Sequence, residues 1–239
     1  MTGRTAAAIR DLSRWITAGL LLMALAGCGS DAPTAGGGKR LADTFTFFDV
    51  DANSSDGEPL RRTLGEHLGR EAVAGKDVLD LAVFSGIALD SVFQALGDLN
   101  GQLNPDPRAR KEHALTSLTY RYPQKHYPTF TYVRLIFSAL HRHPLMITID
   151  ANSEAGSILE TLKAKYGPPL ETRPDGLETT LWSWQREGDW LIVQKRQNKF
   201  GRPEYIITIF YVGRIKELIR AESENVREAE GASRERKAF

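Results

Sequence analysis

The sequence predicts an α+β fold in which a helix followed by a three-stranded antiparallel meander occurs twice. Three observations predict this fold class. Apolar residues recur at helical spacing in two places, β-branched and aromatic runs follow each of them, and the last such run is apolar on both faces. The tandem units would occupy residues 78–150 and 145–213 and share one strand. We expect them to pack as a two-layer sandwich within a folded body at 41–221.

The first unit opens with an apolar stretch at 78–89, which periodicity alone assigns neither to a strand nor to a helix. Asp90 is placed to cap the helix that follows, and Gly97 and Gly101 lie near its predicted end. The apolar face of this helix carries Val92, Phe93, Leu96 and Leu99. Strand-like runs at 115–122, 129–139 and 145–150 complete the first meander.

The second unit repeats this order. Asn152 or Ser153 caps a helix that ends at Gly167, with prolines directly beyond it. The apolar face of the helix carries Ile158, Leu159, Leu162 and Tyr166. Strands are predicted at 178–185, 190–196 and 204–212. Because the last strand is apolar on both faces, we place it at the centre of the sheet.

The regions that flank these units are less regular. A short strand is predicted at 44–48, a turn at 51–57 and a weak helix at 58–75. After Gly213 an amphipathic helix begins, and its apolar stripe consists of Ile215, Leu218 and Ile219. Beyond it, residues 222–239 are almost entirely charged or small, which predicts a disordered tail.

A secretory signal peptide is predicted at 1–27. Arg4, Arg10 and Arg14 precede an apolar run at 15–26, and small residues stand directly before Cys28. The alternative is a membrane-spanning helix, which needs ~20 apolar residues and is therefore longer than this run. Cys28 is the only cysteine. The sequence therefore offers no disulfide, and no thiolate pair for redox chemistry or metal binding.

The segment Leu25-Ala26-Gly27-Cys28 resembles the lipobox of bacterial lipoproteins. The resemblance implies that the Cys28 thiol receives a diacylglyceryl group, that the signal is cut before it, and that the new amino terminus is acylated. An aspartate directly after the cysteine, the usual inner-membrane retention signal, is absent, since Gly29 and Ser30 follow. The resemblance therefore implies sorting to the outer membrane, facing the periplasm. Residues 28–40 form a glycine-rich linker that reaches ~20 Å.

The body at about 78–213 resembles tandem units of the BamE (SmpA/OmlA) class of outer-membrane lipoproteins and, in layout, the secreted β-lactamase inhibitor protein. The residues that carry the resemblance in the first unit are Ile87, Leu89, Ser91, Leu96 and Gly97. Those in the second unit are Ser153, Leu162, Tyr166, Gly167 and Pro168. Asp90 departs from the pattern, because a glycine is usual there. The resemblance implies a module that scaffolds or binds protein partners without catalytic residues.

Constellations for metal or acid–base chemistry are weak, and we expect no metal and no cofactor. Asp49, Asp51, Asn53 and Asp56 suggest either a loose calcium site or, as we favour, an Asx-rich turn, because the EF-hand glycine and glutamate are missing. His141 and His143 fall in a turn without zinc-ligand spacing. An enzymatic site would have to gather members of a dispersed set, namely Asp80, Asp90, Glu112, His113 and His141.

The predicted function is therefore that of a non-catalytic, membrane-anchored module in the cell envelope whose partner is another envelope protein. The formal net charge is only +1, which offers no net attraction for nucleic acid. Aromatic residues around the first meander are candidates for partner binding, either exposed or as core side chains: Tyr120, Tyr122, Tyr127, Phe130 and Tyr132. The alternative function is an enzyme or small-ligand binder that acts on peptidoglycan or lipid.

Overall fold

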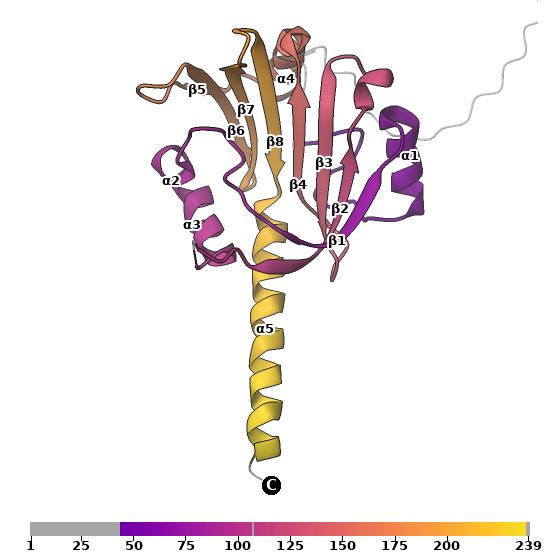
Figure 1. The fold of residues 1–239 in the computed structure, drawn as a ribbon, viewed down its shortest axis with the longest axis vertical. Coiled ribbons are helices and arrows are strands. Elements are labelled where there is room, and N and C mark those ends of the chain that lie inside the picture. Colours follow the sequence, from indigo (N-terminus) through magenta and orange to yellow (C-terminus); the bar gives the residue numbers. More distant parts are fainter. Residues whose placement is uncertain (1–43, 107, 238–239) are drawn as a thin grey trace, which may run out of the picture. The chain divides into compact units, whose positions relative to one another are not determined.

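The fold is organised around one antiparallel sheet, seen face-on in Figure 1. A computed structural model describes residues 44–106 and 108–237, all within the compact unit Arg40–Phe239. Within these residues the sheet has 8 strands in the order β1-β2-β3-β4-β8-β7-β6-β5. The strands are β1 (Ala72–Val78), β2 (Glu112–Tyr120), β3 (Phe130–Ser138), β4 (Pro144–Ala151), β5 (Leu170–Thr172), β6 (Thr179–Arg186), β7 (Asp189–Gln197) and β8 (Pro203–Phe210). The helices are α1 (Glu58–Leu68), α2 (Leu89–Val92), α3 (Gln94–Leu103), η1 (Pro123–Lys125), η2 (Ser153–Ala155), α4 (Gly156–Tyr166) and α5 (Val212–Lys237). The predicted α+β class is confirmed.

The two predicted meanders are confirmed as β2-β3-β4 and β6-β7-β8. The link between β6 and β7 is a tight hairpin, because Arg186 pairs with Asp189 and both Glu187 and Gly188 have positive φ. β8 lies between β4 and β7, the central position predicted from its two apolar faces. Asn152 caps the second helical segment as expected, since its side chain accepts a hydrogen bond from the Glu154 backbone N–H at 3.0 Å.

Helical layers pack against both faces of the sheet, which corrects the predicted two-layer sandwich. One face, the α1 face, forms a core with α1 and α4 that includes Leu64, Leu68, Leu159, Leu135, Ile147 and Ile207. The other face, the strap face, forms a core with α3 and α5 that includes Leu96, Leu99, Leu218, Ile136, Met146 and Phe210. The reason is that β4 and β8 carry apolar side chains on both sides, Ile147 and Ile207 on one and Met146 and Phe210 on the other, so each side needs a cover.

Chain segments before α2 depart most from the sequence prediction. The predicted strand at 44–48 forms only an isolated bridge between Phe47 and Val50. The predicted helix at 58–75 ends at Leu68, because Gly69 takes a φ of 86° and the chain turns into β1. Residues 79–88, here called the strap, are neither helix nor strand and run across the lower part of the sheet in Figure 1. The strap is held down by buried apolar side chains, among them Leu79, Leu81, Phe84 and Ile87.

The helix predicted after Asp90 is interrupted and differently capped. It consists of α2 and α3 with Phe93 between them, and no side-chain cap is formed at the start of either helix. Asp90 therefore lies inside α2 and is not its N-cap. Gly97, expected near the end of the helix, lies inside α3 and packs against Asp90. Close packing of α2 on α3 accounts for the glycine at this position.

α5 continues to Lys237, where the sequence predicted a disordered tail from residue 222. Glutamate, arginine, alanine and lysine are good helix formers, which is sufficient for continued helix where packing ends. In the residues that the structure describes, no helix combines the length and the apolar character that spanning a bilayer requires.

Glu222 fastens the third turn of α5 to β2. Its carboxylate lies 2.6 Å from Lys111 Nζ and 2.9 Å from Nδ1 of His113, which is buried. Burial acts to raise the pKa of the Glu222 carboxyl, but the hydrogen bonds from Lys111 and His113 outweigh it and hold that pKa below its usual value. Glu222 therefore stabilises the fold above the ordinary pKa of glutamate, and this contribution is lost as pH falls through the folded-state pKa.

Replacing Glu222 by alanine is expected to lower the free energy of unfolding by about 1–3 kcal/mol at neutral pH, because it leaves the buried His113 ring unpaired. Glu224→Ala, a charge-matched change at an exposed position of the same helix, is expected to have little effect. Urea denaturation across the acid pH range measures both. The difference between the two variants should shrink toward low pH. A constant difference would mean that Glu222 acts through packing alone.

Candidate functional site

The predicted lipidation residue, Cys28, lies outside the described residues, as do the apolar run at 15–26 and the glycine-rich linker. The site is therefore built from the folded body. Two surfaces of this body combine accessible side chains with unusual chemistry. One is a cluster of aromatic rings beside α1, and the other is a polar cavity beneath the strap.

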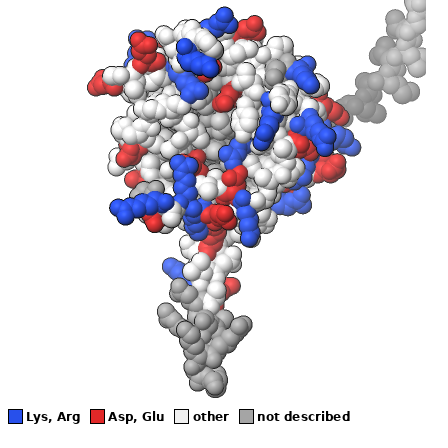
Figure 2. Space-filling model, in the orientation of Figure 1, with Lys and Arg blue, Asp and Glu red and all other residues white. Residues whose placement is uncertain are grey.

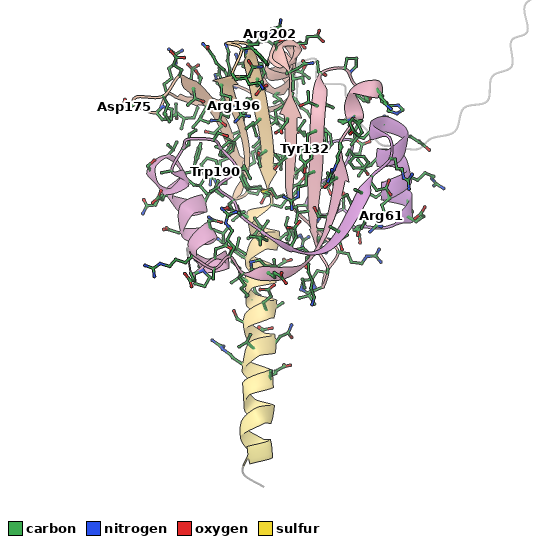
Figure 3. The ribbon with its side chains drawn as sticks, viewed as in Figure 1. Arg61, Tyr132, Asp175, Trp190, Arg196 and Arg202 are labelled. Atoms are coloured by element: carbon green, nitrogen blue, oxygen red, sulfur yellow. The ribbon has the colours of Figure 1, made fainter. Side chains whose placement is uncertain are left out.

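The structure distributes the predicted partner-binding aromatic residues over different environments. Tyr120 is fully buried in the core of the α1 face. Tyr122 is 66% exposed and lies below Lys125, whose Nζ is 6.0 Å from the ring centroid. Tyr132 is on the strap face of β3 and lines the polar cavity (Figure 3). Only Tyr127 and Phe130 are neighbours, so these residues do not form a single surface.

Tyr127 and Phe130 join two further rings to form what we call the aromatic patch: Phe48, His67, Tyr127 and Phe130. The Phe48 ring stacks on the His67 imidazole with centroids 4.6 Å apart and an interplanar angle of 6°. The Tyr127 ring meets the edge of Phe48 at 5.0 Å and stacks on Phe130 at 5.6 Å. All four side chains are half-buried. The patch thus offers a preformed array of ring faces and edges at the protein surface.

Phe48 is presented to the patch by a turn whose backbone is strained. Phe48 and Asp49 have φ values of 45° and 63°, which residues other than glycine rarely adopt. Such positions cost about 1–3 kcal/mol each and persist where the surroundings fix them. Here the paired backbone hydrogen bonds between Phe47 and Val50 close the turn at 3.0 and 2.9 Å. The sequence gives no signal for this turn, because Phe48 reads there as the end of a strand.

A polar cavity of about 380 Å³, the strap groove, lies between the strap, β1, β3 and β4. Asp77 pairs with Arg134, whose Nε also donates to Ser117 Oγ at 3.0 Å. Asp80 pairs with Arg110 at 3.0 Å. Figure 2 shows acidic and basic side chains close together on this face of the molecule, with neither sign dominant. Both arginines of the groove are therefore already engaged by protein carboxylates.

Asp150 is the carboxylate of the strap groove that has no such partner. It lies directly opposite Tyr132 in the β3–β4 register and is half-buried. In the described part of the chain it makes neither a hydrogen bond nor an ion pair through its side chain. Burial raises the pKa of the Asp150 carboxyl, Arg196 opposes the rise, and Glu204 adds to it. An isolated carboxylate of this kind in a cavity is a recognised mark of a functional site.

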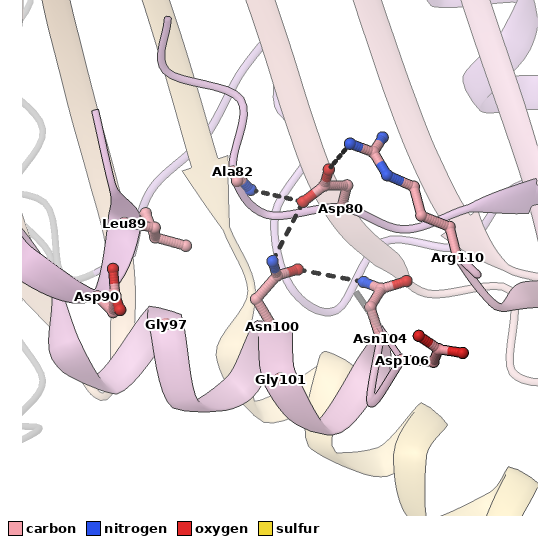
Figure 4. A pocket seen from close by; sticks show the side chains of 10 residues that line it. All are labelled: Asp80, Ala82, Leu89, Asp90, Gly97, Asn100, Gly101, Asn104, Asp106 and Arg110. Carbon is pink, nitrogen blue, oxygen red and sulfur yellow. Dashed lines mark hydrogen bonds and ion pairs between the residues drawn. The ribbon is translucent and has the colours of Figure 1, made fainter. Parts of the chain in front are cut away.

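A second cavity, of about 390 Å³, lies on the other side of the strap and is drawn in Figure 4. Its centre is a hydrogen-bond network between the strap and α3, in which the buried Oδ1 atom of Asn104 has no partner in the described chain. Asp80 Oδ1 accepts from the Ala82 backbone N–H at 3.0 Å and from Asn100 Nδ2 at 3.2 Å. Asn104 Nδ2 donates to the Leu79 carbonyl at 2.9 Å. These bonds tie the strap to α3, so we assign this cavity a structural role.

The residues considered for acid–base chemistry do not converge. Asp80 and Asp90 line this second cavity together, but the Asp80 carboxylate is occupied by Arg110 and the strap. His113 is bound to Glu222, and His141 is exposed at the β3–β4 turn. Asp51 forms the Asx turn that we favoured, since its Oδ1 accepts from the Asn53 backbone N–H at 2.9 Å. Within the described ranges, no group of three or more candidate metal ligands comes together.

Comparisons of this chain with models of protein families, with curated proteins and with solved structures returned no match. The functional argument therefore depends on the residues and their geometry. Of the residues in these two candidate sites, the sequence singled out Tyr127, Phe130 and Tyr132 for partner binding, but it did not single out Phe48, His67 or Asp150. Asp150 lies near the end of β4 without any motif around it, and its isolation becomes visible only when the partners of the neighbouring charges are known.

Proposed function

We propose that this chain is a lipid-anchored protein of the bacterial envelope whose body binds another envelope protein through the aromatic patch. In this proposal Cys28 carries the lipid, the linker sets the reach of the body, and the protein sits on the outer membrane facing the periplasm. The single observation that supports the binding surface is the half-exposed stack of Phe48, His67, Tyr127 and Phe130.

The chemistry of the patch suits recognition of a protein. Aromatic side chains supply much of the binding energy at protein interfaces and lose little conformational entropy on binding. Phe48 is fixed by its strained turn, so the patch is ordered before it meets a partner. Preorganisation of this kind lowers the entropic cost of association. Anchoring on a membrane raises the local concentration further, so that a small interface suffices.

We also propose that the body is a tandem pair of related units, as the sequence predicted, although its two halves do not share the strand at 145–150. The sheet order supports this, because β1-β2-β3-β4 and β8-β7-β6-β5 are two four-stranded halves that meet at β4 and β8. In the first half α3 precedes β2-β3-β4, and in the second half α4 precedes β5-β6-β7-β8. The only strand residue of the aromatic patch is Phe130 of β3, which belongs to the first half. A binding role therefore does not require the two units to act alike.

The anchoring part of the proposal predicts that Cys28→Ala moves the protein out of the membrane fraction. Labelling with radioactive palmitate should be lost at the same time, because the acceptor thiol is absent. Ser30→Ala, a neighbouring change that leaves the thiol in place, should behave like the wild type. Retention of labelled Cys28→Ala protein in membranes would contradict the proposed lipidation site.

The binding part is tested by crosslinking in native membranes followed by affinity purification and mass spectrometry. We expect the wild-type chain to recover a recurrent envelope protein and Tyr127→Ala to recover at least about tenfold less, as for an interface hot spot. Phe200→Ala removes a ring that is 75% exposed and lies outside the patch, and is expected to leave recovery unchanged. Thermal unfolding of purified Tyr127→Ala separates lost contact from lost structure. Undiminished recovery with folded Tyr127→Ala would overturn the assignment of the patch.

A further inference from the structure

The strap groove contains polar groups that the protein itself leaves unsatisfied. Asp150 has no side-chain partner, as described above. Thr148, directly opposite Arg134 in the register, has a buried hydroxyl without a hydrogen-bond partner in the described chain. Native proteins rarely leave such groups unpaired unless something else binds them.

The charges in the groove determine which kind of ligand fits. Arg134 and Arg110 are neutralised by Asp77 and Asp80, which leaves Asp150 as the lining carboxylate without an ion pair in the described residues. Arg196 also acts on the Asp150 carboxyl, but its ion pair is with Glu204. A carboxylate and an alcohol oxygen accept hydrogen bonds from N–H groups. An anionic ligand would instead meet unpaired negative charge. The groove is therefore suited to a cation that carries N–H donors.

The shape of the groove adds a second requirement. Val78, Val83 and Met146 form an apolar part of its lining beside the polar groups. Small-molecule sites commonly combine such apolar walls with a few polar groups that fix orientation. The volume of about 380 Å³ accommodates a short aliphatic chain together with its charged end.

We propose that the strap groove binds an ammonium or guanidinium group carried on a short aliphatic chain, with Asp150 as its counter-ion. The Thr148 side chain lines the groove beside this site, and the Tyr132 ring and the apolar lining contact the chain. The ligand is either a free alkylamine or a lysine or arginine side chain of a peptide. This inference concerns the strap face and is independent of the aromatic patch.

The test is titration of the isotopically labelled chain with cadaverine and with agmatine, followed by NMR. We expect saturable shifts at amides of β3, β4 and the strap. The neutral analogue 1-pentanol should bind at least about tenfold more weakly, because it lacks the charge-assisted hydrogen bonds. Capped lysine and arginine peptides form the second arm. Tighter binding of the peptides than of the free amines assigns the ligand to a peptide, and the reverse assigns it to a free amine.

Asp150→Asn is the decisive variant, since it preserves the shape of the side chain and removes the charge. Binding of cadaverine should fall at least about tenfold, whereas Asp175→Asn, the same change in an exposed loop, should leave it unchanged. Because the Asp150 side chain makes no hydrogen bond or ion pair with another described residue that asparagine would break, the variant should fold, and circular dichroism checks this. Equal binding by Asp150→Asn, or saturable binding of neither amine nor peptide, would overturn the proposal.

The pH dependence gives an independent readout. Binding needs the ionised carboxylate, so affinity should decline as pH falls through the raised pKa of Asp150. The other charged groups that line the groove or act on the Asp150 carboxyl are Asp77, Asp80, Arg110, Arg134, Arg196 and Glu204. Asp150→Asn should abolish the decline in the acid range. A decline of the same size in that variant would place the titrating group elsewhere and contradict the role given to Asp150.

Discussion

Replacing Gly97 by alanine is expected to lower the free energy of unfolding by about 1–3 kcal/mol. A methyl group at this position would lie 2.6 Å from Cα and 2.7 Å from Cβ of Asp90. Both distances are much shorter than van der Waals contact, and the nearer atom belongs to the backbone of α2. Relief therefore requires α2 to move away from α3, which opens the packing at Leu89 and Leu96.

Gly101→Ala is the matched control in the same helix. Nothing lies within 4 Å of a methyl group at this position. Alanine is the better helix former, so this variant should be neutral or more stable by up to about 1 kcal/mol. Urea denaturation of both variants measures the contrast. Equal stability of the two proteins would show that α2 and α3 do not pack as closely as the structure describes.

The effect of Gly97→Ala should also reach the strap groove. α2 begins at the end of the strap, and Asn100 and Asn104 of α3 hold the strap through Asp80 and the Leu79 carbonyl. A displaced α2–α3 pair would loosen these bonds. The amide signals of the strap should then broaden or shift in Gly97→Ala and stay in place in Gly101→Ala.

The parts of the fold that the sequence predicted are those with strong local periodicity. β8 is an example, since the run from Tyr205 to Phe210 is apolar on both faces, which identifies both the strand and its central place. The second helix is another, because Asn152 and Gly167 delimit it through capping preferences that act over a few residues. In these elements local preference and tertiary packing favour the same structure, so the pattern alone is sufficient.

The parts that the sequence did not predict depend on contacts between distant residues. β1 consists largely of small residues without alternation, and it is a strand because β2 supplies its hydrogen-bond partners. The strap is apolar like a strand, but it packs across the sheet rather than pairing with it. The aromatic patch joins Phe48 to His67 and Tyr127, three residues from separate segments. The lack of an ion-pair partner for Asp150 depends on how the neighbouring charged side chains pair with one another, and no sequence pattern predicts it.

Tyr211 connects the core to the strained turn that presents Phe48. Its ring is fully buried. Its hydroxyl donates a hydrogen bond that is shared by the Phe45 carbonyl oxygen at 3.3 Å and the Val50 carbonyl oxygen at 3.1 Å. Burial raises the pKa of the Tyr211 hydroxyl well above its usual value, so the hydroxyl remains a donor at neutral pH. The bonded carbonyls lie on either side of Phe48, so the hydroxyl holds both ends of the turn.

Tyr211→Ala is therefore expected to lower the free energy of unfolding by about 3–5 kcal/mol, the cost of removing a large buried ring. Tyr211→Phe keeps the ring and should cost only about 1 kcal/mol, the net value of the hydrogen bond. Denaturant unfolding measures both values, and NMR of the His67 ring reports on the stacking with Phe48. We expect Tyr211→Phe to retain most of the stability but to weaken this stacking, because the turn has lost its fastening to the core. If the His67 signals are unchanged in Tyr211→Phe, the Phe47–Val50 bridge alone holds the turn, and the aromatic patch is preformed without help from the core.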